Sequence, residues 1–303
     1  MDTTLLAQLF LIGIVSGAPL AVLGLGMSLI LNVAHRFHFA FALTITLGGF
    51  VAAILATQAG VPAPLAVLIA AVAAGLVGAA IEMAIYRPLE RRAGAASLLP
   101  VFVSALGLTI GGQSLIQLVW ARDTTSRPFT LMASERLPMP LDLRLTTLDL
   151  TTLVVFGGIA AVAVVILRFT RAGQVVRGVR GNPLMAAVVG VRPATVYVWI
   201  FALASAASGL AGAFFAARFS ATPAMGFDPM FSAFVVAFLA GAAAPALRVV
   251  LIGLALGVVQ SVSGMWIPSN LTNIVVFGLL FAYLAARGLG VKVPRRLRLA
   301  GKA

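Results

Sequence analysis

Long apolar runs, separated by short polar stretches, occupy most of the chain. The runs lie at 4–33, 37–59, 64–85, 98–120, 151–168, 194–217, 230–245, 247–266 and 271–287. A helix needs about 20 consecutive, mostly apolar residues to cross a bilayer, and most of these runs are long enough. The pattern therefore predicts an all-α fold, a polytopic transmembrane helical bundle of about nine membrane segments, within a range of about eight to ten.

Two places in this pattern depart from simple straight crossings. The first run is longer than one crossing needs, and Pro19 is the expected position of a kink within it. The runs 230–245 and 247–266 meet at Ala244-Pro245-Ala246, and the first of them is short. These two runs are therefore open to two interpretations, two full crossings or a re-entrant helix that lies against protein.

The composition excludes a water-soluble domain. Of the 303 residues, 61% are hydrophobic and 10% are charged, with a mean hydropathy of +1.10, whereas soluble domains carry about 25% charged residues. The chain has no cysteine, which excludes disulfides and thiolate chemistry, and no metal site is expected. The first residues, Met1-Asp2-Thr3-Thr4, lack the basic segment of a cleavable signal peptide, so the first run is expected to remain as a span.

The distribution of charge predicts the orientation in the membrane. Five arginines and no acid lie in 168–192, and six basic residues and no acid lie in 287–302, whereas 121–150 balances basic and acidic residues. Segments rich in Lys and Arg usually face the cytoplasm. Nine crossings with the N-terminus outside place every basic cluster and the C-terminus in the cytoplasm. This clustering also explains the net charge of +13, so no nucleic-acid partner is expected.

The basic segment after the fifth run also contains signals for a short helix. Asn182 suits the N-cap, Pro183 the first helical position, and Gly190 the residue just past the end. The body, Leu184 to Val189, is almost wholly apolar. A helix of two turns is marginal in isolation and needs a surface to pack on. That surface is either the protein's own cytoplasmic face or a groove in a separate subunit, into which Met185 and the valines would insert.

Three motifs carry a resemblance to a known family. The short helix resembles the coupling helix of ABC-importer permeases of the branched-chain amino acid (LivH-type) family, matched by Arg177, Asn182, Met185, Ala186, Gly190 and Val191. The stretch Ile81-Glu82-Met83-Ala84-Ile85-Tyr86-Arg87-Pro88-Leu89 is similar to the segment after that family's third span. Ser104-Ala105-Leu106-Gly107-Leu108 is similar to a motif in its next span. The three occur in order and in register, so the resemblance covers about residues 5 to 290.

The resemblance implies one ABC-importer transmembrane domain over 1–303 in a bacterial inner membrane. Within it, 121–150 would be a periplasmic loop, 169–193 a cytoplasmic loop with the coupling helix, and 288–303 a basic cytoplasmic tail. The implied partners are two cytoplasmic ATPase subunits, which bind ATP and Mg, a second permease (a paralogue or itself), and a periplasmic or lipid-anchored solute-binding protein. The chain itself would bind no cofactor. The expected ATPase-coupling residues are Arg177, Asn182, Pro183, Leu184, Met185, Ala186, Val188, Val189 and Gly190.

The resemblance also implies a cargo, an amino acid (branched-chain or other hydrophobic) or a related amide or urea-like solute. The chain departs from the family where His38-Phe39-Ala40-Phe41-Ala42 replaces a more polar stretch and where Ala240-Gly241-Ala242-Ala243-Ala244-Pro245 replaces a glycine-rich one. Both changes make the expected path less polar. The candidate path residues, taken from the second and fourth runs, are His38, Phe39, Phe41, Thr44, Thr46, Ser104, Gly107, Thr109 and Gln113.

Each polar candidate also has a purely structural interpretation. Serine and threonine hydroxyls in helices commonly bond to their own backbone, and a glutamine can bond between helices instead of lining a path. His38 suits either a proton relay or a satisfied histidine at the membrane edge. Asp228 suits the cap of a helix that opens at Pro229, or a position facing the solute entrance.

Two other classes of function remain as alternatives. A proton- or ion-coupled secondary transporter, or a channel, would move a small solute without partners. Such carriers normally use carboxylates within the membrane, and the acidic residues of this chain lie near the ends of the runs. A membrane enzyme is not expected, because catalytic groups do not converge in the spans. The sequence also lacks a Walker-type phosphate-binding loop, so ATP hydrolysis would be carried out by other chains.

Overall fold

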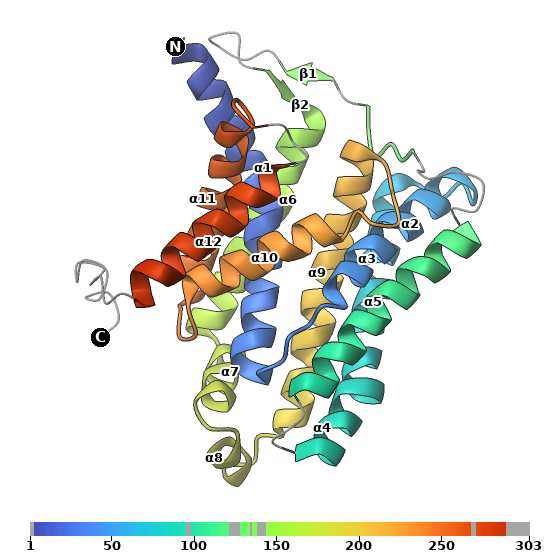
Figure 1. Ribbon diagram of the computed structural model, residues 1–303. Coiled ribbons are helices and arrows are strands. Elements are labelled where there is room, and N and C mark those ends of the chain that lie inside the picture. Colours follow the sequence, from blue (N-terminus) through green and yellow to red (C-terminus); the bar gives the residue numbers. More distant parts are fainter. Residues whose placement is uncertain are drawn as a thin grey trace.

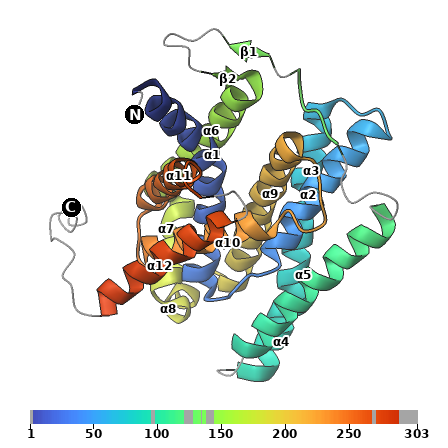
Figure 2. The same cartoon turned by 45° about the horizontal axis from the view of Figure 1, so that its top comes forward.

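Nine long apolar helices and several short segments make up the described part of this computed structural model, which covers residues 3–94, 98–120, 128–133, 135–137, 144–267 and 271–288 (Figures 1 and 2). The long helices are α1 (Thr3–Leu29), α2 (Phe41–Thr57), α3 (Ala63–Ile81), α5 (Leu98–Trp120), α6 (Thr147–Phe169), α9 (Pro193–Phe219), α10 (Phe227–Ala240), α11 (Ala246–Ser263) and α12 (Thr272–Gly288). The short helical segments are η1 (Ile30–Ala34), η2 (Glu82–Tyr86), α4 (Arg87–Ala93), α7 (Arg171–Gly181) and α8 (Pro183–Val188), with η marking π-helical turns. Strands β1 (Arg136–Leu137) and β2 (Leu145–Thr146) pair antiparallel in a small hairpin.

Each of the nine apolar runs has become one helix, as predicted. Six of these helices are long and apolar enough to cross a membrane, and the shorter ones lie at Phe41–Thr57, Phe227–Ala240 and Asn273–Ala286. The chain is therefore a polytopic helical membrane protein. α1 is continuous through Pro19, and its irregular turn lies at the π-helical η1 instead.

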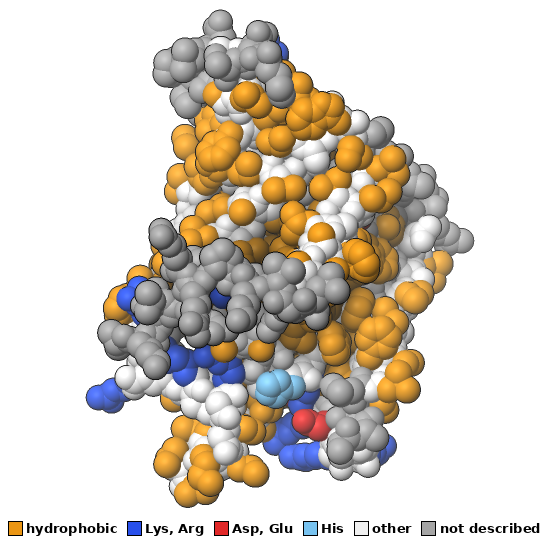
Figure 3. Space-filling model, turned by 60° about the vertical axis from the view of Figure 1, so that its left-hand side comes forward, with side chains coloured by type: hydrophobic (Ala, Val, Ile, Leu, Met, Phe, Trp, Pro, Cys, Tyr) orange, Lys and Arg blue, Asp and Glu red, His pale blue; other side chains and the backbone are white. Residues whose placement is uncertain are grey.

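The bundle has two chemically different ends. The start of α1 and the β1–β2 hairpin lie at one end (Figure 1). There Gln8 exchanges hydrogen bonds of 2.8 and 2.7 Å with the backbone of Arg144. α4, α7 and α8 lie at the opposite end, called here the α8 end. Figure 3 shows basic side chains gathered below a broad hydrophobic belt, on the α8 side of the molecule. Arginines are thus concentrated at one end, as the positive-inside tendency predicts.

The connection between α9 and α10 folds back into the bundle. Ser220 has a positive φ of 71° and ends α9. The following residues pass α2, where Thr46 Oγ1 donates to the carbonyl oxygen of Pro223 (3.4 Å). Gly226 then packs so closely on Ala42 that a Cβ there would overlap the Ala42 carbonyl oxygen. α10 therefore begins beside the first turn of α2, and its 14 residues span only about 21 Å.

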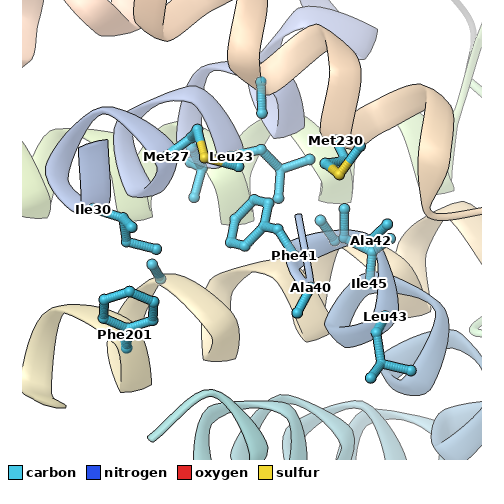
Figure 4. Close-up of a cluster of buried hydrophobic side chains, with 14 of the residues drawn as sticks. Leu23, Met27, Ile30, Ala40, Phe41, Ala42, Leu43, Ile45, Phe201 and Met230 are labelled. Carbon is cyan, nitrogen blue, oxygen red and sulfur yellow. The ribbon is translucent and has the colours of Figure 1, made fainter. Parts of the chain in front are cut away.

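The core consists of helices in close backbone contact together with a cluster of large side chains. A Cβ added at Gly48 would overlap the backbone of Gly209, and one at Gly257 would overlap the backbone of Gly17. Small residues permit such close approach between helices in lipid. Phe41 is fully buried, and its ring points toward side chains of α1 (Figure 4).

Candidate functional site

α8 is formed by the start and stop signals predicted from the sequence. Asn182 is the N-cap, and its Oδ1 accepts hydrogen bonds of 3.0 Å from the backbone N–H groups of Leu184 and Met185. Pro183 occupies the first turn, and Gly190, just past the end, has a φ of 89° that favours glycine. The local sequence therefore marks where this helix begins and where it ends.

The apolar side chains of α8 are not packed against the bundle. Leu184, Met185, Val188 and Val189 are between 64% and 79% exposed, whereas Ala186 is buried and anchors the helix. Figure 3 shows hydrophobic side chains reappearing at the lowest point of the molecule, below the basic band, at the level of α8 in Figure 1. Of the two predicted surfaces, the protein's own face is excluded for these four side chains. We call them the α8 patch.

α7 holds this helix in a fixed position relative to α6. Thr170 caps α7 by accepting from the backbone N–H of Gly173 (3.4 Å). Gly173 packs so closely on the end of α6 that a Cβ would overlap the backbone of Leu167. The Arg177 guanidinium donates to the carbonyl oxygen of Leu167, one of the carbonyls that the end of a helix leaves without a partner. Arg177 thus serves to position the arm that carries α8, and α7 also contacts η1.

A buried ion-pair network lies at the same end of the bundle. Arg36 precedes α2 and binds the carboxylates of Glu82, in η2, and Glu90, in α4. Arg36 and Glu82 are almost completely buried, and the Arg36 guanidinium also lies over the Tyr197 ring at 5.5 Å. The network joins the start of α2 to the end of α3, at two π-helical turns of the kind that frequently occur at functional sites.

The structure places most of the predicted path residues inside the bundle. His38 is fully buried, and its Nδ1 lies 3.0 Å from the Tyr86 hydroxyl. Thr44 bonds to the Phe41 carbonyl oxygen (2.9 Å) and to Ser208 Oγ (2.7 Å), so its hydroxyl is satisfied within the bundle.

The remaining candidates lie on α5 and differ in their burial and hydrogen bonding. Thr109 and Ser104 donate to carbonyl oxygens of their own helix (both 2.9 Å), which is the purely structural role predicted for such hydroxyls. Gln113 is buried, and Gly107 is exposed on α5. Of the predicted set, Phe39 alone lines the cavity described next.

A cavity of about 460 Å³ opens on the face formed by α5, α10 and α12. Its walls are apolar side chains only, and most of them are phenylalanines. They are Phe37, Phe39, Leu99, Phe102, Phe231, Phe234, Val235, Phe238, Phe277 and Leu280. The rings contact one another across helices, as in the Phe39–Phe102 pair at 4.9 Å and the Phe231–Phe277 pair at 5.4 Å. We call this space the phenylalanine cavity.

Sequence reasoning from polar residues missed this cavity. The available signal was the spacing of Phe227, Phe231, Phe234 and Phe238, which places their rings along one side of a helix. In a membrane helix such a stripe has no polar face to contrast with it, so periodicity alone does not separate lipid-facing from cavity-facing rings. The other walls come from distant segments that only the fold brings together.

The structure decides one of the two interpretations of Asp228, the helix cap. α10 begins at Phe227 with Gly226 as N-cap and no side-chain cap, so the prediction that Asp228 caps the helix is wrong. The helix begins two residues earlier than the Pro229 signal suggested, because Gly226 packs against α2. Asp228 lies exposed in the first turn, where its Oδ1 accepts from Asn273 Nδ2 of α12 (2.7 Å).

Comparison with known proteins gives consistent results. Residues 9–284 match the family described as the permease component of the branched-chain amino acid transport system. The chain is similar to the high-affinity branched-chain amino acid transport system permease protein LivH of Salmonella typhimurium and of Escherichia coli, with 23% identity over 297 residues and 92% of each chain covered. It is 24% identical to the corresponding BraD protein of Pseudomonas aeruginosa, covering 92% of this chain and 93% of that one. No solved structure matches the chain.

Proposed function

The chain belongs to the family of branched-chain amino acid transport system permease components, and from this premise we propose that it is one permease subunit of an ABC importer. In this proposal it forms half of the translocation path for an amino acid or a related amide or urea-like solute. Separate cytoplasmic ATPase subunits supply the energy. The chain binds no cofactor itself, because ATP and Mg are held by those partners.

One observation carries the proposal, the exposure of the α8 patch. Fully burying a side chain such as leucine or valine contributes about 1.5–3 kcal/mol, so four exposed apolar side chains on a capped helix are a strong basis for partner binding. The arm is held rigidly by Arg177 and Gly173, and therefore a displacement of α8 by a partner would move α6 and η1. An apolar helix seated in a groove of an ATPase subunit fits both facts.

The proposal also assigns the orientation and the remaining partners. The basic α8 end faces the cytoplasm of a bacterial inner membrane, and the N-terminus and the β1–β2 hairpin face outward, with nine crossings. A second permease, a paralogue or another copy, covers the open side of the phenylalanine cavity, where Phe277 and Leu99 are exposed. A solute-binding protein delivers cargo to the outer end. The tail 288–303, proposed to be cytoplasmic, and most of 121–150 lie outside the described residues.

Replacing Met185 with aspartate tests the proposal. A charge in the centre of the α8 patch should abolish co-purification of the ATPase subunits, because the buried carboxylate would have no partner in an apolar groove. Gln174→Asp is the matched control, since it adds the same charge to an exposed position of α7 outside the patch. We expect this variant to retain the ATPase subunits. Unchanged co-purification of Met185→Asp would contradict the proposal, and solute uptake by the purified chain alone would indicate a carrier or channel instead.

A further inference from the structure

A hydrogen-bonded polar pair, Asp228 and Asn273, lies one turn before cavity-lining residues on α10 and α12. On α10, Asp228 lies three residues before Phe231, and on α12, Asn273 lies four residues before Phe277. Residues three or four apart share one face of a helix. On each of the two helices, the polar residue therefore lies on the same face as a residue that lines the cavity. α10 and α12 contact each other along the front of the bundle (Figures 1 and 2).

The polar pair offers a carboxylate with spare hydrogen-bonding capacity. Asp228 accepts one hydrogen bond from Asn273, and an ionised carboxylate can accept about four. In the part of the chain that the structure describes, Glu82, Glu90 and Asp149 are each paired with an arginine, but no ion pair is formed by Asp228. Its exposed oxygen is thus available to a cationic donor from outside the chain.

The cavity provides a complementary apolar compartment below this carboxylate. The Phe231–Phe277 ring contact lies one turn beyond the Asp228–Asn273 bond and is part of the cavity wall. Phe39 and Phe234, with ring centroids 4.9 Å apart, also line the cavity. A volume of about 460 Å³ falls within the usual range for small-ligand sites. Edge-to-face ring contacts are favourable for aromatic guests, so these walls favour an aromatic body over a branched one.

We propose that this is the solute-recognition site of the path, where Asp228 accepts hydrogen bonds from a protonated amine and the phenylalanine cavity holds a bulky, preferably aromatic, body. The site deepens the proposed function and rests on it. One carboxylate and one amide are too few oxygen ligands for a metal ion, whereas they suffice for an ammonium group. The selected solutes are therefore amphipathic amines.

Competition binding to the full-length chain in lipid nanodiscs, together with whichever subunits co-purify, tests the site. The probe is radiolabelled L-phenylalanine, competed with phenethylamine, 3-phenylpropanoate, L-leucine and urea. Phenethylamine retains the amine and should compete, whereas 3-phenylpropanoate lacks it and should compete at least about tenfold less well. L-Leucine should compete more weakly than unlabelled L-phenylalanine, and urea should not compete.

Substitutions then locate the binding. Asp228→Asn keeps the shape of the side chain and should weaken L-phenylalanine binding by about tenfold or more, because a charge-assisted hydrogen bond is lost. Phe277→Ala should weaken binding of L-phenylalanine more than that of L-leucine. Glu135→Gln is the control, since it removes one negative charge from an exposed position near the hairpin. It should bind as the original chain does.

Several outcomes would overturn the inference. These are the absence of L-phenylalanine binding, equal binding by Asp228→Asn and the original chain, or equal competition by 3-phenylpropanoate and phenethylamine. Displacement of the probe by oleate, with no dependence on Asp228, would assign the cavity to an acyl chain instead. The ATPase test remains separate. If Asp228→Asn binds normally while Met185→Asp loses the ATPase subunits, the recognition site is wrong and the importer function stands.

Discussion

Two kinds of helix contact divide the molecule. In the seams between α1 and α11 and between α2 and α9, small residues let backbones touch, and a Cβ added at Gly253 or Gly212 would overlap the facing helix. On the face formed by α5, α10 and α12, phenylalanine rings from different helices line an open cavity instead.

The difference shows how one apolar composition produces both tightly packed helix interfaces and apolar surfaces that are open to ligands or partners. Lipid tails are as apolar as leucine, so helices in a membrane associate through close van der Waals packing and hydrogen bonds. Glycine and alanine permit that packing, and large rings prevent it. The seams therefore fix the shape of the bundle, and the phenylalanine cavity and the α8 patch are two of the apolar surfaces that the described residues leave uncovered. These are the surfaces to which we assign solute and ATPase binding.

Gly212→Val should break a seam and have the largest effect, loss of most of the folded protein. The added side chain would overlap the carbonyl oxygen of Ile45 and approach the backbone nitrogen of Gly49 (3.1 Å from the Cβ). Neither is the end of a flexible side chain, so α2 and α9 would have to separate. The measurement is the yield of monodisperse chain in size-exclusion chromatography after mild detergent extraction.

The same substitution on the open face is the control. On α5, a Cβ at Gly111 would meet no heavy atom of the described residues within 4 Å. Gly111→Val should therefore keep its yield, with a change in stability within about 0.5 kcal/mol. A comparable loss in both variants would show that the β-branched residue harms any helix here, and the contrast between seam and face would fail.

Arg36→Ala should have the next largest effect, because it breaks the two ion pairs that join the segment before α2 to η2 and α4. Loss of the guanidinium leaves the buried Glu82 carboxylate without its partner, which costs about 3–5 kcal/mol in the free energy of unfolding. Glu82→Gln should cost less, since Arg36 keeps its pair with Glu90. Thermal unfolding midpoints of the detergent-solubilised variants measure both.

The double variant, Arg36→Ala with Glu82→Gln, sharpens this test. It removes the unpaired charge as well as the pair, so it should unfold at a higher temperature than Arg36→Ala alone. If the double variant is the least stable of the three, the ion pair stabilises through its own attraction, and the penalty for an unpaired buried carboxylate is not the governing effect.

Features set by neighbouring residues were predictable from the sequence. The cap at Asn182, the first-turn Pro183 and the positive φ of Gly190 were all confirmed, because each depends on a few consecutive residues. The apolar runs likewise marked the helices, since length in lipid is a local property. The back-bonding of Thr109 also follows from its own helix.

Features that depend on several distant segments were not predictable. The phenylalanine cavity takes its walls from 37–39, 99–102, 231–238 and 277–280, and no single segment shows it. The helix cap predicted at Asp228 was wrong because the start of α10 is set by contact with α2. Whether the expected path and coupling residues act in transport is still a prediction, to be tested by the substitutions described here.

Asn182→Ala should have the smallest effect and tests whether the α8 patch depends on local signals instead of burial. The side chain satisfies two backbone N–H groups, and its loss costs about 1 kcal/mol of helix stability. In the proposed complex the ATPase subunit binds only the folded helix, so its affinity should fall by about fivefold. Asn182→Asp keeps an accepting oxygen and should bind almost normally. If Asn182→Ala loses ATPase binding as completely as Met185→Asp, Asn182 contacts the partner directly. If binding is unchanged, the partner's groove imposes the helical conformation, and the α8 patch also takes its structure from burial.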